Sequence, residues 1–191
     1  SSGIGAATAR LFAEYGCNVV INYSRNEAGA QKVADDCRTL GVEALVVQAD
    51  VSRDEDCRAL VQATLDQFGR LNILVNNAGT TLFCAHENLD GLSADDFLNI
   101  YRVNTVGPYQ MVRAAEKALR DSGVAHVVNM ASIAGLAGVG SSIAYAASKG
   151  ALLTMTKSLA RVMGPQVRVN AICPGFVQGE WLAQGLGQER Y

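Results

Sequence analysis

The stretch "SSGIGAATARLFAEYGCNVVIN" (residues 1–22) contains the first two elements of the chain. Gly3 and Gly5 stand at the start of a run that is typical of a helix, and the β-branched run at 17–22 then predicts a buried strand. Glycines at a helix start let a phosphate approach free backbone N–H groups, although glycine pairs also precede helices that bind nothing. The stretch therefore raises the hypothesis of a nucleotide-binding α/β fold.

Helices and strands alternate along the rest of the chain. Strands are expected at 43–51, 71–77, 125–131 and 167–175, and helices at 26–41, 52–69, 93–119 and 142–163. Ser52, followed three residues later by Glu55, predicts a capping box, and Pro108 predicts either a kink in the long helix or a break into two. Alternating elements with strands apolar on both faces predict one domain over 1–191, a Rossmann-like doubly wound parallel sheet with helices on both faces.

Composition narrows the class of protein. With 191 residues, 49% of them hydrophobic, and 16 basic against 18 acidic side chains, the chain predicts a globular domain that binds small molecules rather than nucleic acid. It has no apolar run of the roughly 20 residues that span a bilayer and no leader pattern, which predicts no membrane association and a cytoplasmic location. The five cysteines form no CxxC pair and the two histidines lack ligand spacing, so we expect reduced, mostly buried thiols and no metal.

Small, polar and glycine residues follow every expected strand. In a doubly wound sheet, ligands bind outside the carboxyl ends of the strands. The stretches at these ends are "YSRN" (23–26), "ADVS" (49–52), "NNAG" (76–79), "ASIAG" (131–135) and "CPGFV" (173–177). Ordinary turn chemistry explains any one of them, but the five together with "SGIG" (2–5) favour a ligand site along this edge.

The most specific pattern is "YAASKGAL" (145–152). Tyr145 and Lys149 are four residues apart and share one face of the expected helix, a pair that is also common on solvated helices. Ser132 directly follows an expected strand, so its hydroxyl can face the same edge. A phenol, an amine and a hydroxyl in one place suit proton transfer at a carbonyl group.

These motifs, in this order, resemble the short-chain dehydrogenase/reductase family over essentially all 191 residues. The resemblance is carried by "SGIG", "NNAG", Asn104 in "YRVNTVG" (101–107), Ser132 in "NMASIAG" (129–135), "YAASK" (145–149) and "RVNAICPG" (168–175). Gly3 and Gly5 match the last two glycines of the family motif TGxxxGxG. The family's first strand would precede Ser1 and its last strand is not found either, so we expect the chain to be incomplete at both ends and part of a longer polypeptide.

The resemblance implies an NAD(P)-dependent oxidoreductase that transfers a hydride between nicotinamide and a ketone or secondary alcohol, such as a carbonyl or 3-oxoacyl reductase. It implies that Tyr145 is the general acid/base, with its pKa lowered by Lys149, and that Ser132 holds the substrate oxygen. Asn104 would support a water near the lysine, or satisfy backbone groups freed by the helix kink. The cofactor-binding residues that it implies are Gly3, Ile4, Gly5, Ser24, Arg25, Asp50, Val51, Asn77, Ala78, Gly79, Tyr145, Lys149, Pro174, Gly175 and Val177.

NADP is expected to be preferred, with NAD possible. No acidic residue occupies 22–26 to accept from a ribose 2′-hydroxyl, whereas Arg25 and Ser24 can donate to a 2′-phosphate. Arg25 could instead be merely solvated, and Ser2 stands where the family has a basic residue. Gly179 stands where the family often has a threonine that contacts the cofactor, which puts that contact in doubt.

The resemblance also implies an oligomeric state and the segments that form the substrate pocket. It implies a homo-oligomer, a tetramer, formed through the helices at 93–119 and 142–163, where the second helix carries small residues: Ala144, Ala147, Ser148 and Ala151. The substrate pocket is expected from residues 80–92, 133–143 and the segment after Gly175. A regulatory protein that binds the dinucleotide without turnover, and an epimerase or dehydratase on the same fold, are the alternatives.

Overall fold

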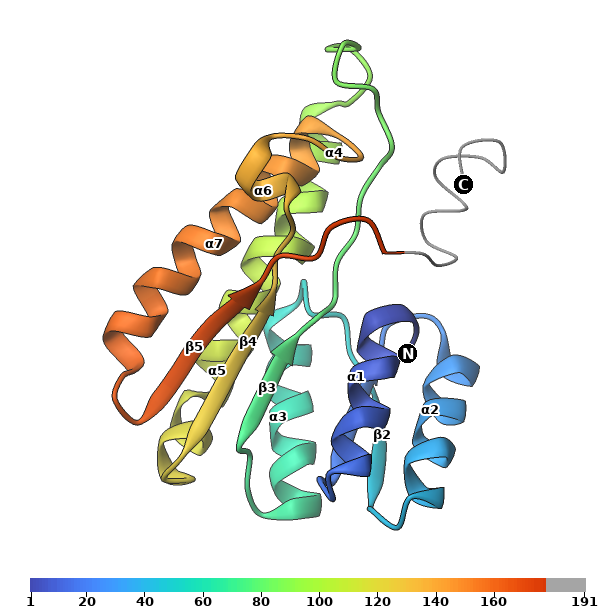
Figure 1. Ribbon diagram of the computed structural model, residues 1–191, viewed down its shortest axis with the longest axis vertical. Helices are drawn as coiled ribbons and strands as arrows, with labels where there is room; N and C mark the ends of the chain where they lie inside the picture. Colours follow the sequence, from blue (N-terminus) through green and yellow to red (C-terminus); the bar gives the residue numbers. More distant parts are fainter. Residues whose placement is uncertain (178–191) are drawn as a thin grey trace.

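The computed structural model describes residues 1–177 (Figure 1). Its strands are β1 (Val19–Tyr23), β2 (Ala44–Gln48), β3 (Ile73–Asn76), β4 (Ala125–Met130) and β5 (Val167–Ile172). Its helices are α1 (Gly3–Glu14), α2 (Glu27–Thr39), α3 (Asp54–Phe68), α4 (Ala94–Tyr101), α5 (Gly107–Asp121), α6 (Ala134–Ala137) and α7 (Ile143–Met163), with the π-helical segment η1 (Arg102–Val106) between α4 and α5. This is the alternation that the sequence predicts.

All strand pairs in the described part of the chain are parallel. β1 pairs with β2, while β4 lies between β3 and β5 in a second sheet. A groove lies between the two sheets and is lined by residues of β1 and of β3. In Figure 1, α1 and α2 lie in front of β2, and α3 and α5 lie behind the strands. The result is a Rossmann-like α/β fold with its strand ends directed toward one edge.

The structure has two hydrophobic cores, and the larger one reaches both sheets, because Val20 of β1 and Val47 of β2 pack against it. Around β1 and β2, small buried residues of α1 and α2 such as Ala13, Ala30 and Ala34 let the two helices approach each other. Around the second sheet, α3, α5 and α7 contribute larger side chains, among them Leu119, which is completely buried. Packing of apolar surface on this scale is the main stabilising contribution to such a fold.

The start of α3 differs from the predicted capping box. The helix begins at Asp54 with Arg53 at the N-cap position, and no side chain caps it. The backbone N–H of Ser52 donates to Oδ1 of Asp50 at 2.9 Å, and Glu55 accepts from Arg53 at 2.7 Å. The prediction was wrong because Asp50 forms a turn with Ser52 and draws it out of the helix. A capping box does occur at the start of α4, between Ser93 and Asp96.

The long helical stretch changes from α-helix to a π-helical segment just before Pro108, which lies in the first turn of α5. Proline has no N–H, so it cannot form the helical hydrogen bond to the carbonyl four residues earlier. The irregularity precedes the proline, in the π-helical segment η1, and this segment carries Asn104. Gly107 follows directly, and a Cβ there would lie 3.0 Å from Cγ2 of Val51. The helix therefore changes its winding where it passes the carboxyl end of β2.

Two further details of the expected structure are corrected. Residues 131–141 are not all loop, because α6 forms one short turn in which Gly135 packs against the backbone of α7 at Lys149. The five cysteines are free thiols, but only Cys37 and Cys57 are buried. The other three, Cys17, Cys84 and Cys173, are partly exposed.

Candidate active site

The carboxyl ends of the strands open onto one end of the groove between the two sheets. Of the residues predicted for the site, all except Asn104 line it. They come from the start of α1, the ends of β1, β2, β3, β4 and β5, and the first turns of α7. The structure therefore brings together segments that are up to about 170 positions apart in the sequence, as expected when parallel strands share one edge.

The start of α1 presents backbone N–H groups to the groove. The first intrahelical bond runs from the N–H of Ala6 to the carbonyl of Ser2, so the N–H groups of Gly3, Ile4 and Gly5 precede it. Gly3 has a φ of +52°, a conformation that side chains disfavour. A Cβ at Gly5 would lie 2.5 Å from Nδ2 of Asn77, so the two glycine-containing motifs touch. The helix starts at Gly3, and its dipole favours an anion at this point.

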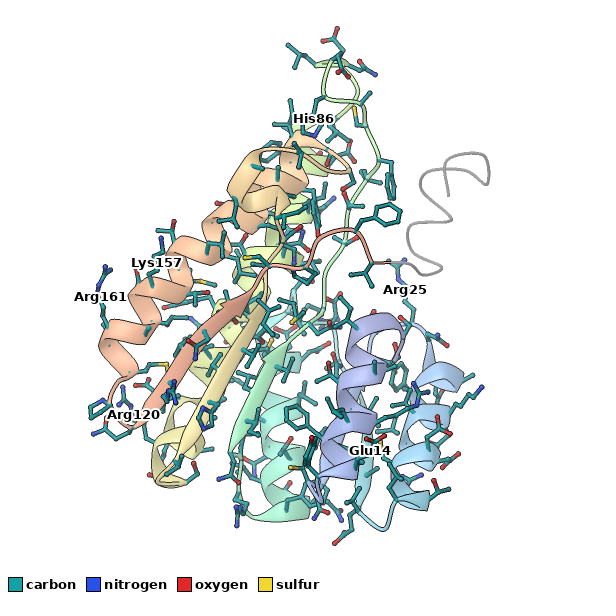
Figure 2. The ribbon with its side chains drawn as sticks, in the orientation of Figure 1. Glu14, Arg25, His86, Arg120, Lys157 and Arg161 are labelled. Atoms are coloured by element: carbon teal, nitrogen blue, oxygen red, sulfur yellow. The ribbon has the colours of Figure 1, made fainter. Side chains whose placement is uncertain are left out.

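The ends of β1 and β2 carry exposed polar side chains. Ser24, Arg25 and Asp50 are all exposed, and Figure 2 shows Arg25 at the turn from β1 to α2. Asp50 is held in place, because its N–H donates to Oδ2 of Asp56 at 2.9 Å. The guanidinium group of Arg25 therefore borders the groove at this end, beside the backbone of Asp50, which Asp56 holds in position.

Ser132, Tyr145 and Lys149 meet at the ends of β4 and α7. Ser142 caps α7, with its hydroxyl accepting from the N–H of Tyr145 at 3.2 Å. The hydroxyl of Tyr145 forms a side-chain hydrogen bond with Ser132, whose Oγ also accepts from the N–H of Ala134 at 3.1 Å. The ammonium group of Lys149 lies 5.7 Å from the centre of the Tyr145 ring. One helix and one strand end therefore place all three groups together.

The predicted lowering of the Tyr145 pKa is not found. Burial raises the pKa of Tyr145 above its ordinary value of 10.0, and the hydrogen bond with Ser132 offsets only part of this increase. Burial also lowers the pKa of Lys149 from 10.5 to about 8, because the ammonium group is taken out of water. Desolvation is the largest cause of both pKa shifts, and the spacing of the two residues in the sequence does not reveal it.

Asn104 lies behind the groove wall and is completely buried. Its Oδ1 accepts from the N–H of Thr80 at 2.8 Å, and its Nδ2 donates to the carbonyl of Thr80 at 2.9 Å and to Oγ of Ser148 at 3.0 Å. The side chain thus satisfies the backbone after β3, not that of its own helix. A Cβ at Gly79 would lie 3.4 Å from Oδ1 of Asn104 and 3.5 Å from Nζ of Lys149, so both groups face this glycine.

Three buried polar side chains that the sequence analysis did not predict form a chain of hydrogen bonds next to the site. Nδ2 of Asn76 donates to Oδ1 of Asn129 at 2.9 Å, and Nδ2 of Asn129 donates to Oγ1 of Thr156 at 2.9 Å. It links β3, β4 and α7 directly beneath the site residues. The sequence does indicate this chain, because Asn76 and Asn129 stand near the ends of two mainly apolar strands. Polar groups that are buried in this way need hydrogen-bond partners.

The loop after β3 is fastened to the loop before α7. The hydroxyls of Thr81 and Ser141 lie 2.7 Å apart, and the N–H of Cys84 donates to the carbonyl of Ser141 at 2.8 Å. Together with the pairing of Thr80 and Asn104, these bonds fix one wall of the predicted substrate pocket. Gly179, where a cofactor contact was in doubt, lies outside the described residues.

A sequence profile described as "short chain dehydrogenase" matches residues 1–189. The chain belongs to the short-chain dehydrogenase family. It is 41% identical over 181 residues to a presumed ketoacyl reductase of the granaticin polyketide synthase of Streptomyces violaceoruber, covering 95% of this chain and 71% of the relative. It is 33% identical over 178 residues to the 3-oxoacyl-[acyl-carrier-protein] reductase of a Synechocystis strain, covering 93% and 71%.

Solved structures of short-chain dehydrogenases superpose closely. The structure of a presumed short-chain dehydrogenase/reductase from Burkholderia xenovorans has a TM-score of 0.92 and 45% identity, and the match covers 95% of this chain and 76% of that one. An NAD⁺-bound xylitol dehydrogenase has a TM-score of 0.87 and 31% identity, covering 94% and 68%. As a short-chain dehydrogenase, the protein is an oxidoreductase that acts on CH–OH or C=O groups, in a family that binds nicotinamide dinucleotides.

No helix of residues 1–177 has the length and apolar character needed to cross a membrane. No group of three or more His, Cys, Asp or Glu side chains in this part of the chain is arranged to hold a metal ion.

Proposed function

We propose that this short-chain dehydrogenase reduces ketones with NAD(P)H, with Tyr145 as the general acid. The observation that carries the proposal is the hydrogen bond between Tyr145 and Ser132 beside Lys149, at the edge of the groove. A proton donor and a second hydroxyl group so close together can both reach one carbonyl oxygen. When a hydride adds to the carbonyl carbon of a ketone, the oxygen must gain a proton, and a side chain held in position can supply it.

The groove fits the cofactor at several points. The N–H groups of Gly3, Ile4 and Gly5 and the dipole of α1 suit a pyrophosphate, and the close contact of Gly5 with Asn77 keeps side chains out of that place. Asp50 and Val51 would flank the adenine, and residues 77–79 the adenosine. Pro174, Gly175 and Val177 would lie along the nicotinamide. When bound, the cofactor supplies or accepts the hydride.

The side chains at the reaction end would divide the remaining work. Ser132 would hold the substrate oxygen and Tyr145 would donate a proton to it. Because burial raises the pKa of Tyr145, the phenol stays protonated at neutral pH, which suits the direction of reduction. Lys149 would hold the ribose hydroxyls of the nicotinamide. Asn104 would keep Thr80 and Gly79 in place beside the lysine.

We infer a preference for NADP over NAD from the end of β1. Arg25 is exposed and lines the groove, and residues 22–26 contain no carboxylate to repel a phosphate. A guanidinium group pairs with phosphate through charge-assisted hydrogen bonds, with Ser24 as a further donor. NAD remains usable if Arg25 contributes little.

A homotetramer in the cytoplasm is the proposed state of the protein. Exposed apolar side chains on α4, η1, α5 and α7, among them Leu98, Val106 and Tyr109, suit association through these helices. Of the four small residues of α7 that were expected at the interface, Ala144 and Ser148 are buried within the chain itself, which leaves only Ala147 and Ala151 for a partner. The association of family members through these helices is the main support.

A 3-oxoacyl thioester is one candidate substrate, since two relatives are named as ketoacyl or 3-oxoacyl reductases. One assay distinguishes the proposed ketone reduction from the alternative function, which is dinucleotide binding without turnover. Purified protein is mixed with NADPH and a panel of neutral and anionic ketones, and the loss of NADPH absorbance is followed. Turnover of any ketone that disappears in Tyr145→Phe supports the proposal, and tight NADPH binding with no turnover across the panel contradicts it.

A further inference from the structure

The reaction end of the groove is walled by apolar side chains. Beyond Ser132 and Tyr145, it is lined from three segments by Phe83, Ile133, Val139, Phe176 and Val177. Each of these side chains is exposed, between 39% and 65%, although each is large and hydrophobic. Exposed apolar surface that gathers in a concave site marks a place where a ligand covers it.

Charge is scarce at this end and has the wrong sign for an anion. Among the described residues that line it from 80–87, 132–145 and 174–177, Glu87 is the only carboxylate, and neither lysine nor arginine is present. Lys149 lies deeper and directs its ammonium group to the carbonyl of Met130 at 2.7 Å. His86 also lines the groove and lies near α6 in Figure 2, with its Nε2 buried against α6 and α7. A carboxylate or phosphate here would lose its water and gain no lysine or arginine partner from these described residues.

The apolar wall is held in position before any substrate enters. The bonds of Thr81 and Cys84 to Ser141 fix Phe83 against the loop that carries Val139. On the other side, the N–H of Ile133 donates to the carbonyl of Pro174 at 3.1 Å, which ties the third segment of the wall to the same loop. Side chains on fixed backbone discriminate between ligands more sharply than side chains on mobile loops, because less ordering is needed on binding.

We infer that the substrate is an uncharged ketone with an apolar body next to the carbonyl, and that ketones carrying a carboxylate or phosphate near the carbonyl are rejected. This rests on the proposed function, since Ser132 and Tyr145 fix where the carbonyl oxygen lies. The apolar body would lie against the wall formed by Phe83, Ile133, Val139 and Phe176. Burial of apolar area attracts the neutral ketone, and desolvation with repulsion from Glu87 excludes the anion.

Three size-matched aryl ketones test the inference: acetophenone, 4-acetylbenzamide and 4-acetylbenzoate. The amide has the shape of the carboxylate without its charge, so it separates charge from size. We expect kcat/KM for 4-acetylbenzoate to be lower than for 4-acetylbenzamide by about thirtyfold or more, since an unpaired charge costs more to bury than a neutral polar group. Acetophenone should be the best of the three.

Substitutions in the apolar wall test whether these residues set the preference for neutral ketones. Val139→Lys places a cation at the reaction end and should raise kcat/KM for 4-acetylbenzoate by about tenfold while lowering it for acetophenone. Leu89→Lys is the matched control, because Leu89 is an exposed apolar residue in the loop that carries Phe83 but does not line the groove. Phe83→Ala should lower kcat/KM for acetophenone and leave the KM for NADPH unchanged.

The outcomes separate this inference from the proposed function. Reduction of the neutral ketones with rejection of the acid, reversed by Val139→Lys, supports it. If the acid is reduced as well as the amide, or if only anionic ketones in the wider panel turn over, the inference is wrong while the proposed function stands. If NADPH binds and no ketone of either charge is reduced, the proposed function fails and the inference fails with it.

Discussion

The ammonium group of Lys149 donates a 2.7 Å hydrogen bond to the backbone carbonyl of Met130, the last residue of β4. One residue earlier on the same strand, Asn129 is bonded to Thr156, which lies two turns further along α7. Helix α7 is therefore fixed to the end of β4 at two points on one face. Because Ser132 follows β4 and Tyr145 opens α7, this attachment sets the distance between them.

Tyr145→Phe should lower kcat for ketone reduction by about a hundred- to ten-thousandfold, because it removes the proposed proton donor. The affinity for NADPH, measured by fluorescence titration, should change by less than about threefold, since the ring and its packing remain. Tyr109→Phe, on the exposed side of α5, is the control and should leave both quantities unchanged. Undiminished turnover in Tyr145→Phe would remove Tyr145 from the mechanism.

Lys149→Met should change how stability depends on pH. The pKa of Lys149 is about 8 in the folded protein and 10.5 when exposed, so between these values the unfolded chain binds more protons. The free energy of unfolding of the wild type should therefore rise relative to the variant, by about 3 kcal/mol from pH 8 to pH 10.5. Denaturant unfolding across this range measures the difference.

Lys157→Met, at an exposed position of the same helix (Figure 2), is the control for the substitution itself. A difference between wild type and Lys149→Met that stays constant with pH would show that burial does not lower the pKa of Lys149.

Thr156→Val should destabilise the fold. Its hydroxyl accepts from Asn129 and donates to the carbonyl of Leu152 at 2.7 Å, and valine of the same shape leaves the buried amide of Asn129 with one partner fewer. We expect the free energy of unfolding to fall by about 1–3 kcal/mol. The matched change Thr154→Val, at an exposed position of α7, should stay within about 0.5 kcal/mol of wild type. Equal effects of the two changes would mean that the polar chain contributes nothing.

Arg25→Ala should alter the choice of cofactor. Loss of a charge-assisted contact with the 2′-phosphate should lower kcat/KM for NADPH by about ten- to a hundredfold, while the value for NADH should stay within about twofold. Steady-state kinetics with both cofactors measures this, with Lys157→Ala as the control for net charge. Equal losses for the two cofactors would show that Arg25 does not recognise the phosphate.

Val106→Glu should reduce the mass of the proposed tetramer in light scattering. Val106 is exposed in η1, between the helices expected at the interface, and a buried carboxylate without a partner is costly. Val124→Glu, at an exposed position after α5, should leave the mass unchanged. A monomeric wild type at all concentrations tested would overturn the proposed assembly.

Much of the fold is determined by local sequence. Apolar strands that alternate with amphipathic helices leave few arrangements other than parallel strands covered by helices, and the observed elements fall where the pattern predicts them. The pairing of Tyr145 with Lys149 was predictable because residues four apart share a helix face. The location of Ser132 was predictable because it directly follows a strand whose end faces the ligand edge.

Other features depend on contacts between distant residues. The partner of Asn104 is the backbone of Thr80, 24 positions away, and the attachment of Lys149 is a carbonyl group, which every residue possesses and no sequence pattern marks. The start of α3 was mispredicted because Asp50 competes for Ser52. The pKa of Tyr145 was expected to fall beside a lysine but is raised, because the degree of burial is set by the packing of α7 against β4 and α6.

The sequence by itself determined which chemical groups are present and on which elements they stand, since helix and strand periods are local properties of the chain. The tertiary structure decided how these groups are solvated and what holds them, because desolvation and hydrogen bonding arise only when the elements pack. It also decided the character of the substrate wall, where Phe83, Val139 and Phe176 come from three loops that the sequence separates by 37 or more positions.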